Sequence, residues 1–105
     1  MPGVEGSARV TTYTLPVEYD KLSFAERAEV RTQYLRAQRG KCLHCHASLG
    51  GVPTAAVCEA QVNWSYFPDG FQAAPIHLHH SHTTGLTLGA VHMRCNAVLW
   101  QYHGK

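Results

Sequence analysis

The pattern of apolar and polar positions predicts a capped helix in the first half of the chain. Ser23 and Glu26 have the spacing of a capping box, in which each side chain accepts a hydrogen bond from the other residue's backbone N–H. Good helix formers continue up to Gly40, which is suited to the left-handed conformation that ends many helices. Residues 10–17 are β-prone, but Pro16 limits them to an edge strand or an extended arm.

The last third of the chain has the pattern of a hairpin followed by a helix. Residues 76–80 and 86–91 are short β-prone segments separated by a polar loop at residues 81–85. Residues 94–102 then favour a helix that Gly104 would end. The fold class expected from these elements is α+β, with one helix before the hairpin and another after it.

The middle of the chain, residues 47–74, is rich in turn-forming glycine and proline and is expected to be mostly loop. Within it, residues 56–67 have the β-propensity of a third strand, where Cys58 would be a small buried side chain. Three aromatic residues of this segment would pack over the hairpin or contact a substrate: Trp64, Tyr66 and Phe71.

Length and composition indicate one small domain without a membrane segment. The chain has 105 residues, of which 45% are apolar, and no apolar run approaches the roughly 18 residues that a membrane-spanning helix needs. We divide it into a flexible or extended arm at residues 1–20 and a domain at residues 21–105. Because no signal peptide is apparent, we expect a cytoplasmic protein whose four cysteines bind metal rather than form disulfides.

The net charge is small, but the charged residues are unevenly distributed. The formal charge is +2, and acidic residues are absent from residues 30–58 and 70–105. Basic residues in these two stretches could face the phosphates of a nucleic acid. We assign four of them to DNA contact: Arg36, Arg39, Lys41 and Arg94. An ordinary solvated helix face explains any one of them equally well.

Two short motifs have the spacing of a tetrahedral zinc site. Cys42-x-x-Cys45 and His92-x-x-Cys95 supply four sulfur or imidazole ligands. A closed site of this kind contributes on the order of 10 kcal/mol to folding. Cys58 in place of His92 would give an all-cysteine site, an alternative that the spacing leaves open. The first motif also matches the C-x-x-C-H haem-attachment pattern, which belongs to exported proteins and is disfavoured here.

The histidines before the second zinc motif have the chemistry that phosphodiester hydrolysis needs, namely a base for water and a site for a cation. Adjacent residues on a regular strand point to opposite faces, so one of His79 and His80 would hold a metal while the other faces water. His82 would share the side of His80 if the strand continued. Asn96 directly follows the zinc ligand Cys95, so a zinc site would hold its amide near the hairpin.

Three segments together resemble the HNH, or ββα-metal, endonucleases, and most closely the phage recombination endonuclease VII subgroup. They are Tyr-Leu-Arg-Ala-Gln-Arg-Gly-Lys-Cys-Leu-His-Cys at 34–45, His-Leu-His-His-Ser-His-Thr-Thr-Gly at 77–85 and Gly-Ala-Val-His-Met-Arg-Cys-Asn at 89–96. Each is moderately specific alone, and their order makes the resemblance specific. The resemblance implies a small zinc-stapled ββα-metal (His-Me finger) domain with an N-terminal helix and one divalent cation.

The resemblance also implies roles for individual residues. His80 falls on the general base of the family, and His82 falls on the histidine that contacts the scissile phosphate or assists the leaving group. His79 and Asn96 fall on the two residues that bind the catalytic cation, and His77 falls on a position suited to phosphate contact. The zinc positions of the subgroup correspond to Cys42, Cys45, His92 and Cys95.

Two departures from the family pattern bear on this interpretation. His79 stands where the subgroup has an aspartate, which favours borderline ions such as Mn²⁺, Co²⁺ or Ni²⁺ over the hard Mg²⁺ ion. Thr87 stands where many HNH proteins have an asparagine that supports the base, so another group must orient His80.

The function expected from the sequence is metal-dependent hydrolysis of DNA, by nicking or double-strand cleavage, in a phage-derived protein inside a bacterial host cell. The expected state is a monomer or a homodimer with no membrane contact. The principal alternative is a non-catalytic, zinc-stapled DNA-binding module in which the histidines are idle. A histidine-rich metal buffer is a weaker alternative, because it explains neither Asn96 nor the zinc spacing.

Overall fold

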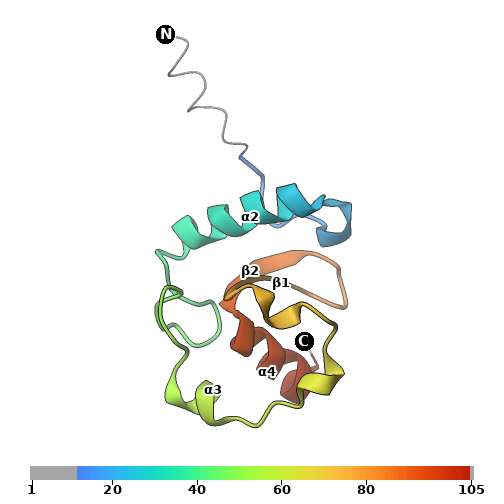
Figure 1. Ribbon diagram of the computed structural model, residues 1–105. Coiled ribbons are helices and arrows are strands. Elements are labelled where there is room, and N and C mark those ends of the chain that lie inside the picture. The colour runs from blue at the N-terminus through green and yellow to red at the C-terminus, as the bar shows by residue number, and fades with distance from the viewer. Residues whose placement is uncertain (1–11, 105) are drawn as a thin grey trace.

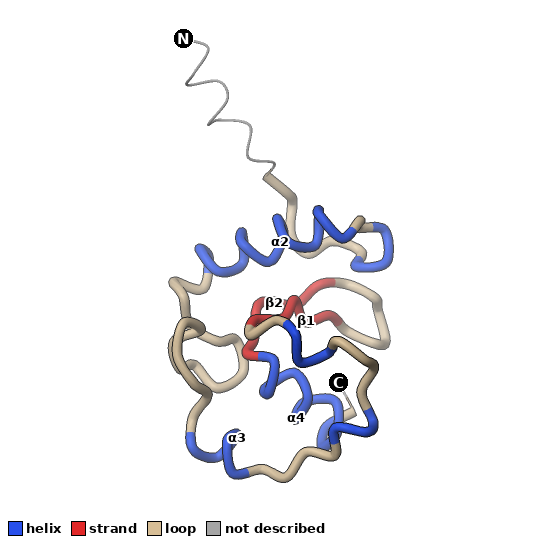
Figure 2. Tube along the Cα trace, viewed as in Figure 1, coloured by secondary structure: helices blue, strands red, loops and turns tan. Residues whose placement is uncertain are grey.

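The structure, a computed structural model, describes residues 12–104 and has an α+β fold built around one two-stranded antiparallel sheet. Helix α2 packs on one side of the hairpin and helix α4 on the other (Figure 1). Figure 2 shows how much of the remaining chain is loop. The main elements are α2 (Phe24–Ala37), α3 (Ala55–Glu59), β1 (Ile76–His80), β2 (Thr87–His92) and α4 (Met93–His103), with short 3-10 turns at Tyr19–Lys21, Trp64–Tyr66 and Phe71–Ala73.

Helix α2 begins with the capping box that the sequence predicts. The Glu26 backbone N–H donates to Ser23 Oγ at 3.1 Å, and the Ser23 N–H donates to Glu26 Oε1 at 2.8 Å. The helix ends at Ala37, earlier than expected, because Arg39 and Gly40 both adopt positive φ angles of 56° and 74°. This reversal turns the chain directly into the first cysteine motif.

The hairpin contains a bulge at the pair of adjacent histidines. Its register pairs His79 with Gly89 but His80 with Thr87, so Leu88 has no partner on the opposite strand. A bulge of this kind bends the ladder and re-aims the side chains beside it. The extra residue lies on β2, opposite the two histidines of β1.

The outer edge of β2 is covered by the end of α2 and the chain that follows it. Gln38 exchanges two hydrogen bonds with the Ala90 backbone, at 2.8 and 2.9 Å, and the Leu43 N–H also donates to the Ala90 carbonyl. Gly89 permits this approach, since a Cβ there would lie 2.6 Å from Gln38 Oε1. The covered edge is closed to further strand pairing.

The segment before α2 forms no regular strand among the described residues and contains a bend at Leu15 and Pro16 and the 3-10 turn Tyr19–Lys21. Glu18 makes only an isolated bridge with Leu86. Val17 is held to the hairpin by Thr87, whose N–H donates to the Val17 carbonyl at 2.8 Å and whose Oγ1 accepts from the Val17 N–H at 3.0 Å. The part of the predicted arm at residues 1–11 lies outside the described residues, as does Lys105.

The third strand predicted at residues 56–67 is wrong. This stretch forms α3 and the turn Trp64–Tyr66, in which Asn63 Oδ1 accepts from the Ser65 N–H. β-Propensity depends on the surroundings of a segment, and here the backbone N–H groups of Val57 and Cys58 donate to the Thr54 carbonyl instead of to a strand. No helix within residues 12–104 is long and apolar enough to cross a membrane.

The core lies where α2, the hairpin, α4 and the first cysteine motif meet. Its buried members include Val30, Leu78, Val91 and Cys95, all packed in one cluster. Two of the cysteines belong to this core, so the packing and the metal chemistry of the chain share the same space.

Thr87→Val is expected to destabilise the fold by about 1–3 kcal/mol, because it leaves buried polar groups without a hydrogen-bond partner. Thr87 is buried, and its Oγ1 lies 2.9 Å from the Tyr34 hydroxyl as well as bonding to Val17. Urea unfolding of the purified variants measures the change. Thr83→Val, at an exposed position of the hairpin turn, is the matched control, and equal unfolding midpoints for the two variants would contradict the prediction.

Candidate functional site

Four side chains from distant parts of the sequence converge on one point beside the core. The ligand atoms of Cys42, Cys45, His92 and Cys95 all lie within 4.8 Å of one another. Three sulfurs and one imidazole at this separation are a donor set that can hold a zinc ion. Within residues 12–104 no other group of three or more histidine, cysteine, aspartate or glutamate side chains converges in this way.

The His92 imidazole is oriented as a metal ligand. Its Nε2 lies 2.8 Å from the Ser48 carbonyl, to which it donates a hydrogen. Its Nδ1 faces the cluster and lies 3.5 Å from Cys45 Sγ and 3.6 Å from Cys95 Sγ. A carbonyl that fixes the tautomer of a ligating histidine is a regular feature of zinc sites, so the residues present fit the metal.

The first cysteine motif is a tight turn that aims both sulfurs inward. The Cys42 N–H donates to the Ala47 carbonyl, and the His46 N–H donates back to the Cys42 carbonyl with His46 at a φ of 67°. The close approach of the Cys42 and Cys95 thiols lowers the pKa of Cys42 and raises that of Cys95. Sulfurs packed this closely share protons that a bound cation would displace.

Cys58 takes no part in this cluster. It is exposed on α3, and its thiol donates to the Pro53 carbonyl at 3.4 Å. Both expectations for it, a buried small side chain or a substitute for His92, are therefore wrong. The predicted strand would have turned alternate side chains into the core, whereas the short helix turns Cys58 outward.

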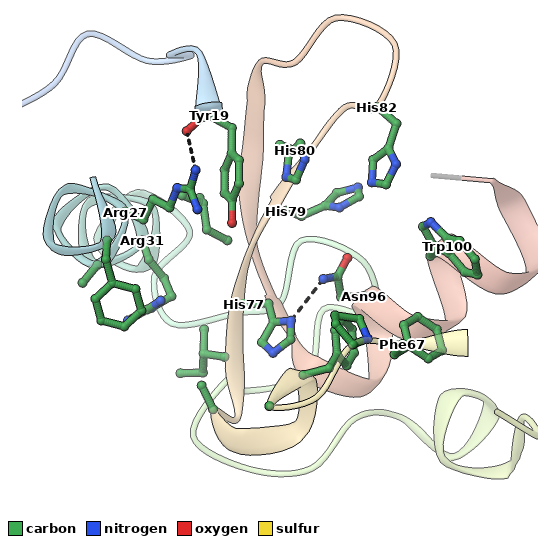
Figure 3. A pocket seen from close by; sticks show the side chains of 18 of the residues that line it. Tyr19, Arg27, Arg31, Phe67, His77, His79, His80, His82, Asn96 and Trp100 are labelled. Carbon is green, nitrogen blue, oxygen red and sulfur yellow. Dashed lines mark hydrogen bonds between the residues drawn. The ribbon is translucent and has the colours of Figure 1, made fainter. Parts of the chain in front are cut away.

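A pocket of about 600 Å³ lies between α2 and α4, next to the cysteine cluster. Its walls come from α2 on one side and from α4 with the loop at residues 66–71 on the other, and β1 forms its floor (Figure 3). Five of the side chains singled out in the sequence line it: His77, His79, His80, His82 and Asn96.

His79 and His80 both line this pocket, as does every residue of β1. His79 is only 4% exposed. Burial lowers its pKa, and the neighbouring Asn96 side chain raises it by a smaller amount. The Asn96 Nδ2 group donates to His77 Nδ1 at 3.1 Å (Figure 3). Asn96 thus contacts a strand histidine and lines the same pocket.

His80 stands in a stack of four planar groups. Its ring lies 3.8 Å from the Tyr19 ring at an angle of 11°, and 5.1 Å from the His82 ring at 13°. The Arg27 guanidinium covers the other face of Tyr19 at 4.0 Å and donates to the Tyr19 carbonyl. The group that orients His80 is therefore an aromatic ring, which lies far from it in the sequence.

Burial favours the neutral form of all three strand histidines. Desolvation lowers the pKa of His77, His79 and His80 below the ordinary value for histidine. For His80 the neighbouring His82 lowers the pKa further, whereas the Asp20 carboxylate raises it. Neutral imidazoles can accept a proton or bind a metal at neutral pH.

The basic residues are arranged differently from the DNA contacts that we predict. Arg36, Arg39 and Lys41 are exposed but do not line the pocket. Arg94 donates to the Val57 and Ala60 carbonyls at 3.0 and 2.7 Å, so its guanidinium holds α3 against α4. Whether any of these side chains contacts DNA stays a prediction.

Three residues that line the pocket were not assigned to the site from the sequence: Tyr19, Arg27 and Arg31. The two arginines are spaced one turn apart on α2, and Figure 3 shows them on the side of the pocket opposite Trp100. That four-residue spacing places them on one helix face, but nothing local to it indicates that this face meets the histidines.

Comparison of the chain with protein-family models, curated proteins and solved structures gives no match.

Cys45→Ala is expected to lose tightly bound zinc, and with it most of the folded state, because a structural site contributes on the order of 10 kcal/mol. The wild type should retain about one zinc ion per chain after dialysis. Metal content by mass spectrometry and far-ultraviolet circular dichroism measure both effects. Cys58→Ala, outside the cluster, is the matched control, and equal zinc content in the two variants would refute the site.

Proposed function

We propose that this protein is a metal-dependent HNH endonuclease with a ββα-metal fold that hydrolyses DNA phosphodiester bonds. The observation that carries the proposal is the convergence of His77, His79, His80, His82 and Asn96 on one pocket at a hairpin–helix junction. Packing alone would not require four histidines around one cavity. The order of the hairpin, the helix and the cysteine cluster along the chain supports the same assignment.

In the proposed reaction His80 acts as general base and removes a proton from the attacking water. The structure supports this role because the His80 ring is fixed between Tyr19 and His82, and because burial keeps it neutral. A base must be both unprotonated and correctly oriented when water attacks. His82, in the turn next to it, would contact the phosphate or assist the departing oxygen.

The catalytic cation would be held by His79 and Asn96. These two residues suit a divalent cation because the His79 imidazole is buried and the oxygen of the Asn96 carboxamide can face the pocket. Nitrogen and amide oxygen donors suit Mn²⁺, Co²⁺ or Ni²⁺ better than the hard Mg²⁺ ion. A divalent ion bound there would supply positive charge to the phosphate. His77 would then position Asn96, in addition to any contact with DNA.

The electrostatics of the pocket suit an anionic substrate. Arg27 and Arg31 line the α2 wall, and Asp69 is the one acidic residue among the side chains that line the pocket. Cations that are already in place can stabilise charge on a phosphate without reorganising during the reaction. Under this proposal the DNA backbone approaches along α2.

His80→Ala is expected to reduce DNA nicking by about 10²–10⁴-fold, since it removes the general base. A supercoiled-plasmid assay with Mg²⁺, Mn²⁺, Co²⁺ or Ni²⁺ measures the rate. His103→Ala, at an exposed position of α4 that does not line the pocket, is the matched control and should retain activity. Binding of plasmid without nicking under every metal would instead favour the DNA-binding module.

The nicking rate is expected to fall as the pH drops through the pKa of His80. That pKa is lowered by burial and by His82, so the rate should stay flat at neutral pH and decline only below the ordinary histidine range. Asp20 raises this pKa, so Asp20→Asn should move the decline to still lower pH. Rates measured across the pH range test the shift. Glu18→Gln, which removes a carboxylate paired with Lys21, is the control. If the pH–rate profile of Asp20→Asn does not move, the assignment of His80 as general base is contradicted.

A further inference from the structure

The wall of the pocket that faces α2 is aromatic. Tyr66, Phe67, Phe71 and Trp100 all line it, and they contact one another in a continuous cluster. The Phe67 ring lies 5.3 Å from the Trp100 ring edge to face, and Figure 3 shows both side chains across the histidine row from the arginines. The loop at residues 60–74, which serves no metal or base role, supplies most of this wall.

The cluster is held in place but incompletely covered. Phe71 packs edge-on against the His77 ring at 4.7 Å, which ties the loop to the pocket floor. Even so, Tyr66 is 58% exposed and Trp100 is 41% exposed. Rigid aromatic rings with an open face beside a polar site are typical of a surface that receives another flat apolar group.

We infer that this aromatic wall stacks an unpaired nucleobase, so that the substrate of the pocket is single-stranded or locally unpaired DNA. The inference rests on the proposed nuclease function. In a duplex each base is covered on both faces by its neighbours, whereas an unpaired base can place its face on a ring. A base against Tyr66 and Trp100 would leave its phosphate near the histidine floor and the arginines of α2.

Charge complementarity favours a nucleic acid strand, rather than a segment of a protein, as the occupant of the pocket. The pocket joins an aromatic wall to a wall with two arginines, Arg27 and Arg31. Aromatic platforms beside a cationic groove are the arrangement by which proteins bind single strands without regard to sequence. An apolar protein partner would offer no negative charge to the two arginines.

Fluorescence anisotropy with a labelled 20-nucleotide single strand, and with its duplex, tests the inference. The zinc-loaded wild-type protein is used without any other divalent metal. We expect tighter binding of the single strand, and we expect Tyr66→Ala to weaken it by about 10-fold, with little effect on the duplex. Tyr66→Phe, which keeps the ring, should bind as the wild type does. Leu88→Ala, at a similarly exposed site away from the pocket, is the control.

Three results would overturn the inference: equal affinity for both DNA forms, no effect of Tyr66→Ala, or a loss in Tyr66→Phe equal to that in Tyr66→Ala. Wild-type dimerisation that Tyr66→Ala abolishes would also overturn it, because a second copy would then cover the wall. Ring-dependent binding of the single strand without nicking under any metal would refute the proposed nuclease and support the inference. Nicking by a protein that shows no preference between the two DNA forms would support the proposed nuclease and refute the inference.

Discussion

The cysteine–histidine cluster is the constraint on which the rest of the structure depends. A two-stranded sheet is only marginally stable alone, and a chain of this size buries a small core. The cluster ties the end of α2 to the junction of β2 and α4, because Cys42 follows the helix and His92 is both the last residue of β2 and the N-cap of α4. Closing these ends together places Asn96 in the first turn of α4, facing the hairpin.

The place of β1 at the edge of the two-stranded sheet is the second constraint. Adjacent residues of a strand point to opposite faces, but the pocket runs along this edge, so every residue of β1 lines it. Tyr19 then stacks on His80, and the Tyr19 N–H donates to the Gly85 carbonyl at 2.9 Å, which fastens this segment to the hairpin turn.

Local signals in the sequence were sufficient for helices α2 and α4, the hairpin and the cysteine cluster. The Ser23 capping box and the C-x-x-C spacing act through neighbouring residues, so they can be recognised without knowing the fold. The strand predicted at residues 56–67 failed because β-propensity depends on tertiary surroundings, and this segment forms α3 and a short turn instead. Arg27 and Tyr19 were missed because their role depends on a tertiary contact between α2, the segment before it and β1.

The burial of His79 bears on why an imidazole, and not a carboxylate, occupies this position under the proposed function. His79 is 4% exposed, and burial lowers its pKa, which favours a neutral ring. A carboxylate at that depth would have to be paired with a cation at all times, because an uncompensated buried charge is costly. Arg27 is already engaged with Tyr19. A neutral ligand keeps the pocket stable before a metal binds, and it shifts the preference among metals from hard to borderline ions.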